Sequence, residues 1–455
     1  MAVKDRVKAS LQKATAKAKA TAGSVREATS RAGTETATSA RKARAAVNAA
    51  PAKVKATPAR IRQARAAHVE RHRPSGFTFA LADSVAMLNP EHWDALTAGA
   101  SVYLSRTYLQ VLESARPENL RPHVALVYRD GRPVAAVSAQ SVDLRGDDLP
   151  KPTAAKALRS ALGTVKDRIL VCGNLLSWGP HGVAFAAGED PEALWPGVAE
   201  ALYRMRRADK LLGETGLVWV KDLTPEVEAT AGALRRFSYQ AFDTEPNMVL
   251  TIPPTWASFE DYLKDLRGGY RNSVKKVRKD FDEAGYTLER LDAEGVAKEA
   301  ATIHALYHQV HDGQKFRLAS LHPDFIPRLA AELGDGFRTH LARDGAGKAV
   351  GFITTLKDQD GAVGYYIGFD KAAAASGAPI YLRLLQQTIE DAIALKAAWL
   401  SLGRTALQPK AQLGARAVPI RCHLRHRLPA MNAVVRACLN LMPEPDQAPE
   451  RNAFK

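Results

Sequence analysis

Two stretches decide the fold: residues 126–140, LVYRDGRPVAAVSAQ, and residues 340–355, HLARDGAGKAVGFITT. Each contains an apolar run, the turn sequence Arg-Asp-Gly and a second run with small residues, which is the pattern of two antiparallel strands joined by a tight turn. Asp-Gly is a common hairpin signal, so the shared turn alone is weak. The order of helices and strands around the two hairpins is the stronger evidence for an internal repeat.

Helices and strands follow one another in the same order around each hairpin. The first copy has helical spacing at 106–115, the hairpin, a buried strand after residue 167, an amphipathic helix at 191–209 and a strand at 216–223. The second copy has helices at 299–313 and 323–333, strands across 337–370, a helix at 379–395 and a strand at 397–404. The sequence therefore predicts an α+β protein with two lobes, at 76–250 and 251–430, each a mixed sheet flanked by helices, and a tail at 431–455.

Residues 1–75 differ in composition from the rest of the chain. They carry 18 Lys and Arg against 4 Asp and Glu, while the other 380 residues carry 46 against 44. The segment is rich in Ala and Thr, lacks aromatic residues and contains Pro51, Pro58 and Pro74, so we expect a disordered or partly helical basic arm. Such an arm either binds a polyanion, as nucleic acid or an anionic membrane, or serves as a solubilising tail. In composition it is similar to the basic tails of bacterial nucleoid-associated proteins.

The remaining bulk features point to a cytoplasmic protein, at most associated with the nucleoid or a membrane surface. Cys172, Cys422 and Cys438 are widely spaced and odd in number, which offers neither a disulfide framework nor a CxxC metal site. The start MAVKDRVKAS lacks an apolar signal region, and no apolar run reaches the length of a membrane span. The oligomeric state stays open.

Residues 258–285 predict one helix with a cationic flank. Ser258 with Asp261 forms a capping signal, Gly268-Gly269 weakens the middle, and Gly285 can end the helix. An apolar stripe faces the core, formed by Leu263, Leu266, Tyr270, Val274, Val277 and Phe281. Beside it lies a cationic row that either binds a phosphate-bearing substrate at a cleft wall or is a solvated flank: Arg267, Arg271, Lys275 and Arg278.

At this point the residues resemble a family. The segments 270–285, 363–370 (VGYYIGFD), 379–395 and 400–420 (LSLGRTALQPKAQLGARAVPI) look like the second lobe of the tandem GNAT-fold proteins, a group that includes the Fem-type aminoacyl transferases of peptidoglycan biosynthesis. The segments 103–113, 128–136 and 169–182 (ILVCGNLLSWGPHG) resemble the first lobe. The resemblance covers about residues 80 to 440. It implies two GNAT-like lobes and acyl transfer from acyl-CoA or an aminoacyl-tRNA to an amine or hydroxyl group.

The resemblance also implies where a coenzyme A donor would bind. In a GNAT lobe the strand before the central helix splays from its neighbour, and the loop that enters the helix offers backbone N–H groups to the pyrophosphate. Here that loop is DKAAAASGAPIY (370–381), so Ser376, Gly377 and Ala378 are the expected cofactor-binding residues. The usual Gln/Arg-x-x-Gly-x-Gly/Ala pattern is absent and Pro379 has no N–H, which leaves a different donor open.

Four residues are candidates for the chemistry. Strand alternation puts Tyr365 and Tyr366 on opposite faces; Tyr366 either protonates a leaving thiolate or packs in the core, and Asp370 either takes the acceptor's proton or caps the next segment. Lys410 occupies, with Gly414, a Lys-x-x-x-Gly position that the resemblance places near the donor. With Arg404 it would stabilise an oxyanion, unless it only forms an ion pair.

His304, His308 and His311 share one helix face, beside Asp312. Metal ligation by such a row is the less favoured interpretation because no second ligand cluster accompanies it, so we expect no metal. The sequence thus predicts a GNAT-like acyltransferase that uses acyl-CoA and a small amine or hydroxyl acceptor. Two alternatives stay open: a Fem-type ligase that depends on aminoacyl-tRNA, and a silent scaffold that tethers nucleic acid or membrane through its arm.

Overall fold

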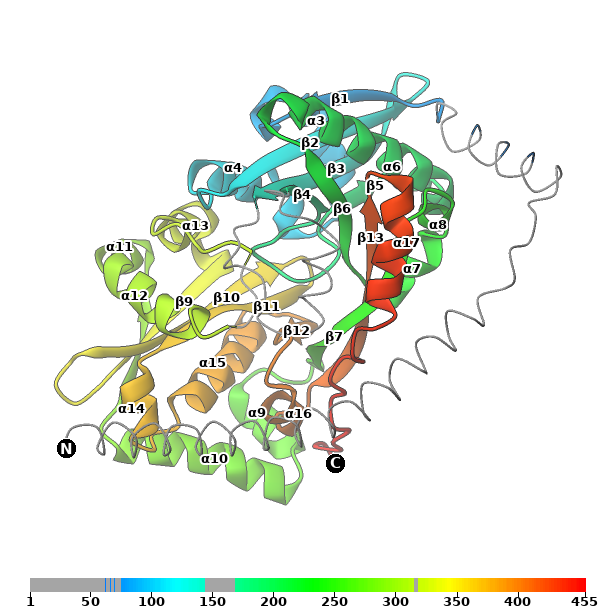
Figure 1. Cartoon of the computed structure of the whole chain (residues 1–455). Helices are drawn as coiled ribbons and strands as arrows, with labels where there is room; N and C mark the ends of the chain where they lie inside the picture. Colours follow the sequence, from blue (N-terminus) through cyan, green and yellow to red (C-terminus); the bar gives the residue numbers. More distant parts are fainter. Residues whose placement is uncertain (1–61, 63–65, 67–68, 70–74, 144–167, 315–317) are drawn as a thin grey trace, which may run out of the picture. The chain divides into compact units, whose positions relative to one another are not determined.

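The computed structural model describes residues 62, 66, 69, 75–143, 168–314 and 318–455 (Figure 1). The basic arm predicted for residues 1–75 therefore lies almost wholly outside the described residues. Residues Pro74–Lys455 form one compact unit. Within the described ranges, no helix has the length and apolar character needed to cross a bilayer.

One mixed sheet runs through this unit. The strands of the first half are β1 Thr78–Ala82, β2 Leu120–Arg129, β3 Arg132–Asp143, β4 Arg168–Cys172, β5 Val183–Phe185, β6 Thr215–Leu223 and β7 Gln240–Thr251. Those of the second half are β8 Thr287–Leu291, β9 Phe337–Arg343, β10 Ala349–Asp358, β11 Gly361–Phe369, β12 Trp399–Ser401 and β13 Arg416–His426. Among the described residues their order is β1-β2-β3-β4-β6-β13-β7-β12-β11-β10-β9-β8, with β5 paired to β3.

The strand order is symmetric and the two halves exchange their last strands. Figure 1 shows β13, near the red end of the colour scale, beside green β6 and β7. Strand β13, which ends the second half, pairs with β6 of the first half, while β7, which ends the first half, pairs with β12 of the second. The halves are therefore joined by backbone hydrogen bonds at the centre of the sheet as well as by side chains.

Helices cover both faces of this sheet. Those of the first half are α3 Pro90–Thr97, α4 Arg106–Ser114, α6 Pro191–Ala208, α7 Pro225–Thr230 and α8 Ala233–Arg236. Those of the second half are α9 Phe259–Asp265, α10 Gly268–Glu283, α11 Ala293–Lys298, α12 Ala300–His311, α13 Phe325–Leu333, α14 Lys371–Ala375, α15 Ile380–Ala394, α16 Leu407–Gln412 and α17 Pro429–Leu439. Alternate residues of β10 contact different helices: Phe352 lies in the same core as α12, and Ile353 in the core of α15.

The largest core includes residues of both halves. Trp93, Tyr108 and Leu112 of the first half share one buried cluster with Phe325 and Tyr365 of the second. Burial of large aromatic rings dominates the energetics of such a cluster. The shared core and the exchanged strands together explain why the two halves form one compact unit.

Both predicted hairpins are confirmed, but only the first has the tight Asp-Gly turn, because residues 344–348 form a longer connection between β9 and β10. Asp130 and Gly131 both have positive φ, 50° and 78°, as a two-residue turn between right-twisted strands requires. In the second copy Gly347 has φ 82°, and the Asp344 carboxylate accepts hydrogen bonds from the N–H groups of Ala346 and Lys348.

The helix predicted over 258–285 is two helices, so the prediction of one was wrong. Asp261 accepts hydrogen bonds from the N–H and hydroxyl of Ser258 at the start, and Gly285 follows the end with φ 77°, as expected. The chain is extended at Leu266 and Arg267, before the glycine pair. There Leu266 forms a β-bridge with Phe454, and the Arg267 N–H donates to the Ala453 carbonyl at 2.9 Å. The C-terminal segment therefore provides the hydrogen-bond partners of the backbone between the two helices.

Candidate functional site

Strands β11 and β12 run parallel and separate after two residue pairs. The pairs are Ala362 with Leu400 and Val363 with Ser401, whereas β11 continues to Phe369. Helix α15 connects these two strands, and the same arrangement occurs in the first half, where β4 and β6 are parallel and α6 connects them. Among the described residues, no strand pairs with the edge of β11 that faces β12 from Gly364 onward, and we refer to this edge as the open edge of β11.

A β-bulge places two tyrosines beside this open edge. Thr354 of β10 stands opposite both Tyr365 and Tyr366, because the register shifts between Ile353 and Thr355. The Thr354 hydroxyl accepts from the Tyr366 N–H at 2.8 Å and lies 3.3 Å from the Tyr366 carbonyl oxygen. The two rings lie 4.4 Å apart, so the expectation that they point to opposite faces was wrong: the extra residue of a bulge breaks the alternation.

Both tyrosines contact the first half of the chain. The Tyr365 hydroxyl lies 2.8 Å from that of Tyr108, which accepts from Asn174 Nδ2 at 2.7 Å. The Tyr366 hydroxyl donates to the Leu176 carbonyl at 2.8 Å. Burial raises the pKa of both Tyr365 and Tyr366 well above the usual value. Both hydroxyls therefore keep their protons at neutral pH and remain hydrogen-bond donors.

A loop of the first half, residues 173–182, covers the end of β12. The indole Nε1–H of Trp178 donates to Ser401 Oγ at 2.8 Å, and Ser401 Oγ donates to Asn247 Oδ1 at 2.8 Å. A Cβ added to Gly403 would lie 2.9 Å from the Trp178 ring, so the indole lies directly against that glycine. The Trp178 ring is 6.4 Å from the Tyr365 ring. This loop therefore approaches the place where β11 and β12 separate.

A buried ion pair holds the loop. Lys221 and Asp222 of β6 are 4% and 0% exposed and bond to each other. Lys221 Nζ also donates to the Ser177 carbonyl at 2.7 Å, and the Gly179 N–H donates to Asp222 at 3.2 Å. Burial acts to raise the pKa of Asp222, but the charges of Lys221 and Arg404 outweigh it and keep the pKa below its usual value. Asp222 also has φ 58°, a strained conformation of the kind found at functional sites.

The predicted residues Arg404 and Lys410 lie together. Arg404 Nη1 is 3.3 Å from Asp222 Oδ1, which ties the loop after β12 to the first half. Lys410 of α16 is 4% exposed and donates to the Arg404 carbonyl. Burial lowers the pKa of Lys410 to about 7, against a smaller upward effect of Glu245. Thr405 and Ala406, between them, have positive φ of 49° and 48°. The side chain of Lys410 therefore supports a strained turn at the end of β12.

The expected phosphate loop is a turn between α14 and α15. The N–H groups of Ser376 and Gly377 donate to the carbonyls of Ala373 and Ala374, both at 3.3 Å, and Gly377 has φ 97°. Helix α15 begins after Pro379 with no side chain capping its first turn. The Ile380 N–H donates to the Ala378 carbonyl at 2.9 Å, and the amides that follow it in the first turn are better placed to bind an anion than those of residues 376 and 377.

Asp370 caps the start of helix α14. Its carboxylate accepts from the N–H groups of Ala372 and Ala373 at 2.9 and 3.2 Å and from Lys348 Nζ at 3.0 Å. The Lys348 hydrogen bond, followed by those from the backbone, lowers the pKa of Asp370. Its position as an N-cap accounts for these contacts.

The cations of α10 differ in their surroundings. Arg278 bonds Glu390 of α15, and its guanidinium lies 4.0 Å from the centre of the Phe259 ring. Burial lowers the pKa of Arg278 to about 10. Lys275 is exposed and Arg271 is half-buried. Arg278 thus fastens α10 to α15, whereas Arg271 and Lys275 are presented at the surface of the helix.

The histidine row lies on α12. His304 Nε2 and His308 Nε2 are 3.1 Å apart, and His308 Nδ1 is 3.2 Å from Asp312. In the described part of the chain no group of three or more His, Cys, Asp or Glu side chains is arranged to hold a metal ion.

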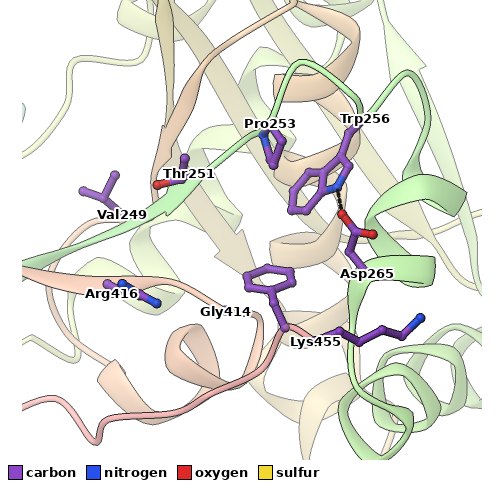
Figure 2. A pocket seen from close by; sticks show the side chains of 9 residues that line it. Val249, Thr251, Pro253, Trp256, Asp265, Gly414, Arg416 and Lys455 are labelled. Carbon is purple, nitrogen blue, oxygen red and sulfur yellow. Dashed lines mark hydrogen bonds between the residues drawn. The ribbon is translucent and has the colours of Figure 1, made fainter.

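A cavity of about 490 Å³ lies elsewhere, below the ends of β7 and β13 (Figure 2). Trp256 and Asp265 form one side, where the indole Nε1–H donates to the carboxylate at 2.6 Å. The other lining residues are Val249, Thr251, Pro253, Gly414, Arg416, Phe454 and Lys455. The catalytic and cofactor residues expected from the sequence do not line this cavity.

Residues 268–410 match the sequence model of a family described as acetyltransferase (GNAT) domain. The second half of the chain contains a GNAT domain. The match covers α10 to α16, and therefore the open edge of β11, the bulge and Lys410. A GNAT domain supports acyl transfer as the class of reaction. Curated proteins give no match to the chain.

Solved structures with a similar fold include several GNAT-related proteins. A tandem GNAT protein from the clavulanic acid biosynthesis pathway is 12% identical, with TM-score 0.45 and coverage of 78% of this chain and 99% of that one. FemX is 10% identical, with TM-score 0.47 and coverage of 74% and 96%. The C-terminal domain of a putative lysylphosphatidylglycerol synthetase from Agrobacterium fabrum is 12% identical, with TM-score 0.45 and coverage of 76% and 94%. At these values the likeness carries no information about substrate.

Sequence reasoning placed its candidates in the GNAT domain and missed the residues of the first half that reach it. Tyr108, Trp178 and Asp222 come from the first half and contact Tyr365, Ser401 and Arg404, and Lys221 bonds Asp222. A Lys-Asp pair inside the apolar strand GLVWVKDL was the one signal available, since charged residues are rarely buried unless they are paired.

Proposed function

We propose that the chain is an acyltransferase that binds acyl-CoA along the open edge of β11 and transfers the acyl group to a small amine or hydroxyl acceptor. The observation that carries this proposal is the separation of β11 from β12 after Val363 and Ser401, inside the region that matches the GNAT family. A strand edge without a partner offers alternating N–H and C=O groups, which suit the amides of a pantetheine arm.

In this proposal, backbone N–H groups and basic side chains bind the phosphate groups of the donor. The uncapped first turn of α15 would supply backbone N–H groups for the pyrophosphate, next to Ala378, whereas the N–H groups of Ser376 and Gly377 already bond carbonyls of α14 and are the weaker candidates. Arg271 and Lys275 supply positive charge for further phosphate groups. Arg278 is the weaker candidate because Glu390 already compensates its charge.

In the reaction that we propose, the acceptor nitrogen or oxygen attacks the thioester carbonyl. The C–S bond breaks as the C–N or C–O bond forms, and the proton lost by the acceptor balances the one gained by the thiolate. Lys410, with Arg404, would stabilise the developing oxyanion from a site shielded from water. Tyr366, which keeps its proton, would turn its hydroxyl from the Leu176 carbonyl to donate a hydrogen bond to the leaving sulfur, and the sulfur would take up the proton that the acceptor loses. Asp370 is held by α14 and Lys348, so we assign it a structural part.

The test is acyl transfer by the full chain, followed as release of coenzyme A thiol from acetyl-CoA and octanoyl-CoA with a panel of amines and alcohols. We expect turnover, and a decrease in kcat of about 100-fold in Lys410→Ala. Lys264→Ala, which changes an exposed lysine paired with Asp261, is the matched control and should behave as wild type. A Lys410→Ala enzyme with wild-type kcat and an intact fold would contradict the role of Lys410.

Binding experiments separate the alternatives. Calorimetry with each acyl-CoA and with charged tRNA should detect the acyl-CoA. Binding of charged tRNA alone would favour a Fem-type ligase, and binding of neither donor would favour a scaffold.

Residues 1–75 would add salt-sensitive binding of nucleic acid or anionic vesicles, with a steep decrease in affinity between about 50 and 200 mM salt. The three free cysteines fit a cytoplasmic protein.

A further inference from the structure

The loop 173–182 is a rigid platform built on the first half. Two of its backbone groups, the Ser177 carbonyl and the Gly179 N–H, bond the buried pair Lys221 and Asp222. The imidazole of His181 folds back on the loop, with Nε2 2.8 Å from the Trp178 carbonyl. The Gly182 carbonyl accepts from the Ser138 N–H of β3 at 2.8 Å. Anchors at both ends fix the backbone on either side of Trp178.

The same loop lies at the point where the two parallel strands of the first half, β4 and β6, stop pairing. Strands β4 and β6 stay paired up to Cys172 and Val220, and the chain then continues into the loop on one side and to Lys221 and Asp222 on the other. The loop thus lies against the end of β6, in the position where the second half leaves an open edge. Of the two related strand pairs, we therefore assign the donor to the pair β11 and β12.

From the platform the Trp178 indole crosses to the second half. It bonds Ser401, which belongs to the last residue pair between β11 and β12, and lies against Gly403, which has no side chain to hold it away. It stands 6.4 Å from Tyr365, one of the two bulged residues of β11. One rigid ring therefore bridges the end of β12 and the bulge of β11, and part of it remains exposed.

We propose that the acyl group of the donor binds between the bulge of β11 and the end of β12, and that Trp178 limits the length of the acyl group that the enzyme accepts there. This inference rests on the proposed function, because the acyl group of a donor bound along β11 would lie between the bulge and β12. The indole is held by a hydrogen bond and by a platform fixed to a buried ion pair, so a longer chain cannot displace it at low cost. A pocket wall of this kind discriminates about 10- to 200-fold per methylene group.

The test compares kcat/KM for acetyl-, butyryl- and octanoyl-CoA in wild type and Trp178→Ala. We expect the ratio of octanoyl to acetyl transfer to rise at least tenfold in Trp178→Ala, and to change less in Trp178→Phe, which keeps a ring but loses the hydrogen bond to Ser401. Trp399→Phe is the matched control: this indole lies at the other end of β12, bonds Asp360, and should leave the ratio unchanged.

The outcomes distinguish the inference from the function on which it rests. Transfer by wild type with an unchanged chain-length ratio in folded Trp178→Ala would overturn the inference alone. If Trp178→Ala fails to fold, Ser401→Ala releases the indole and should raise the same ratio; an unchanged ratio there would overturn the inference. Absence of both transfer and acyl-CoA binding by wild type would overturn the proposed function and the inference together.

Discussion

Lys410 is a buried lysine to which no carboxylate of the described residues bonds, and its charge is costly in the folded protein. Burial lowers its pKa from 10.5 to about 7, so between these two pH values the unfolded chain binds more protons than the folded one. We expect the free energy of unfolding of wild type to rise with pH in this window, relative to Lys410→Met, by up to about 1.4 kcal/mol per pH unit. Urea unfolding at pH 7.5, 8.5 and 9.5 measures this difference, and parallel pH dependences of the two proteins would contradict it.

Lys221 is the opposite case, because it is buried in contact with a carboxylate. Lys221→Met leaves Asp222 buried with less positive charge nearby, which should lower the free energy of unfolding by about 3 to 5 kcal/mol. The double variant Lys221→Met/Asp222→Asn removes the uncompensated charge, while Asn tolerates the positive φ at position 222, so it should recover part of the loss. Denaturant unfolding compares the three proteins, with Lys264→Met as a surface control. Equal stability of the single and double variants would show that the charge on Asp222 is unimportant.

The bulge in β11 is a property of two strands together. Thr354→Val keeps the side-chain volume but removes the hydroxyl that binds the Tyr366 N–H, so we expect a loss of about 1 to 3 kcal/mol in the free energy of unfolding. Acyl transfer should fall as well, since Tyr366 would lose its support. Thr388→Val is the control, because this equally buried hydroxyl bonds the Leu385 carbonyl of its own helix. Similar losses in the two variants would mean that the bulge needs no support from Thr354.

At the scale of elements, sequence patterns identified those with strong periodicity. The hairpin at 120–143, α6 and α15 follow from alternation, helical spacing and the Asp-Gly turn. Strands β7 and β13 were not anticipated, nor was helix α17. Strand β13 contains Pro419, and β7 contains Pro246, so both read as irregular segments. They form strands because each is hydrogen-bonded to a strand on both sides: β7 to β13 and β12, and β13 to β6 and β7.

The exchange of β7 and β13 makes the two halves depend on each other. A fragment of residues 253–455 lacks β7, the strand between β12 and β13, and should be unfolded or aggregated. A fragment of residues 239–455 keeps β7 beside both strands and should retain more structure, although β13 still lacks β6. Circular dichroism and thermal unfolding of both fragments measure the difference. Equal, cooperative folding of the two fragments would contradict this dependence.

The sequence by itself determined the α+β class, the repeat of one unit and the region that resembles a GNAT domain. These follow from local patterns: alternation, helical periodicity, turn residues and the GNAT-like segments at 363–370 and 400–420. It also supplied Lys410, Arg404 and Tyr366, which lie in or beside the loop after β12 and the bulge of β11.

Only the tertiary structure decided what surrounds those residues. The exchange of the last strands, the bulge that turns Tyr365 and Tyr366 to one side, and the approach of Trp178 to Ser401 each join residues far apart in the chain. The lowered pKa of Lys410 likewise comes from burial beneath other elements. The physical reason is that strand pairing, desolvation and side-chain packing depend on partners distant in sequence, which local patterns do not specify.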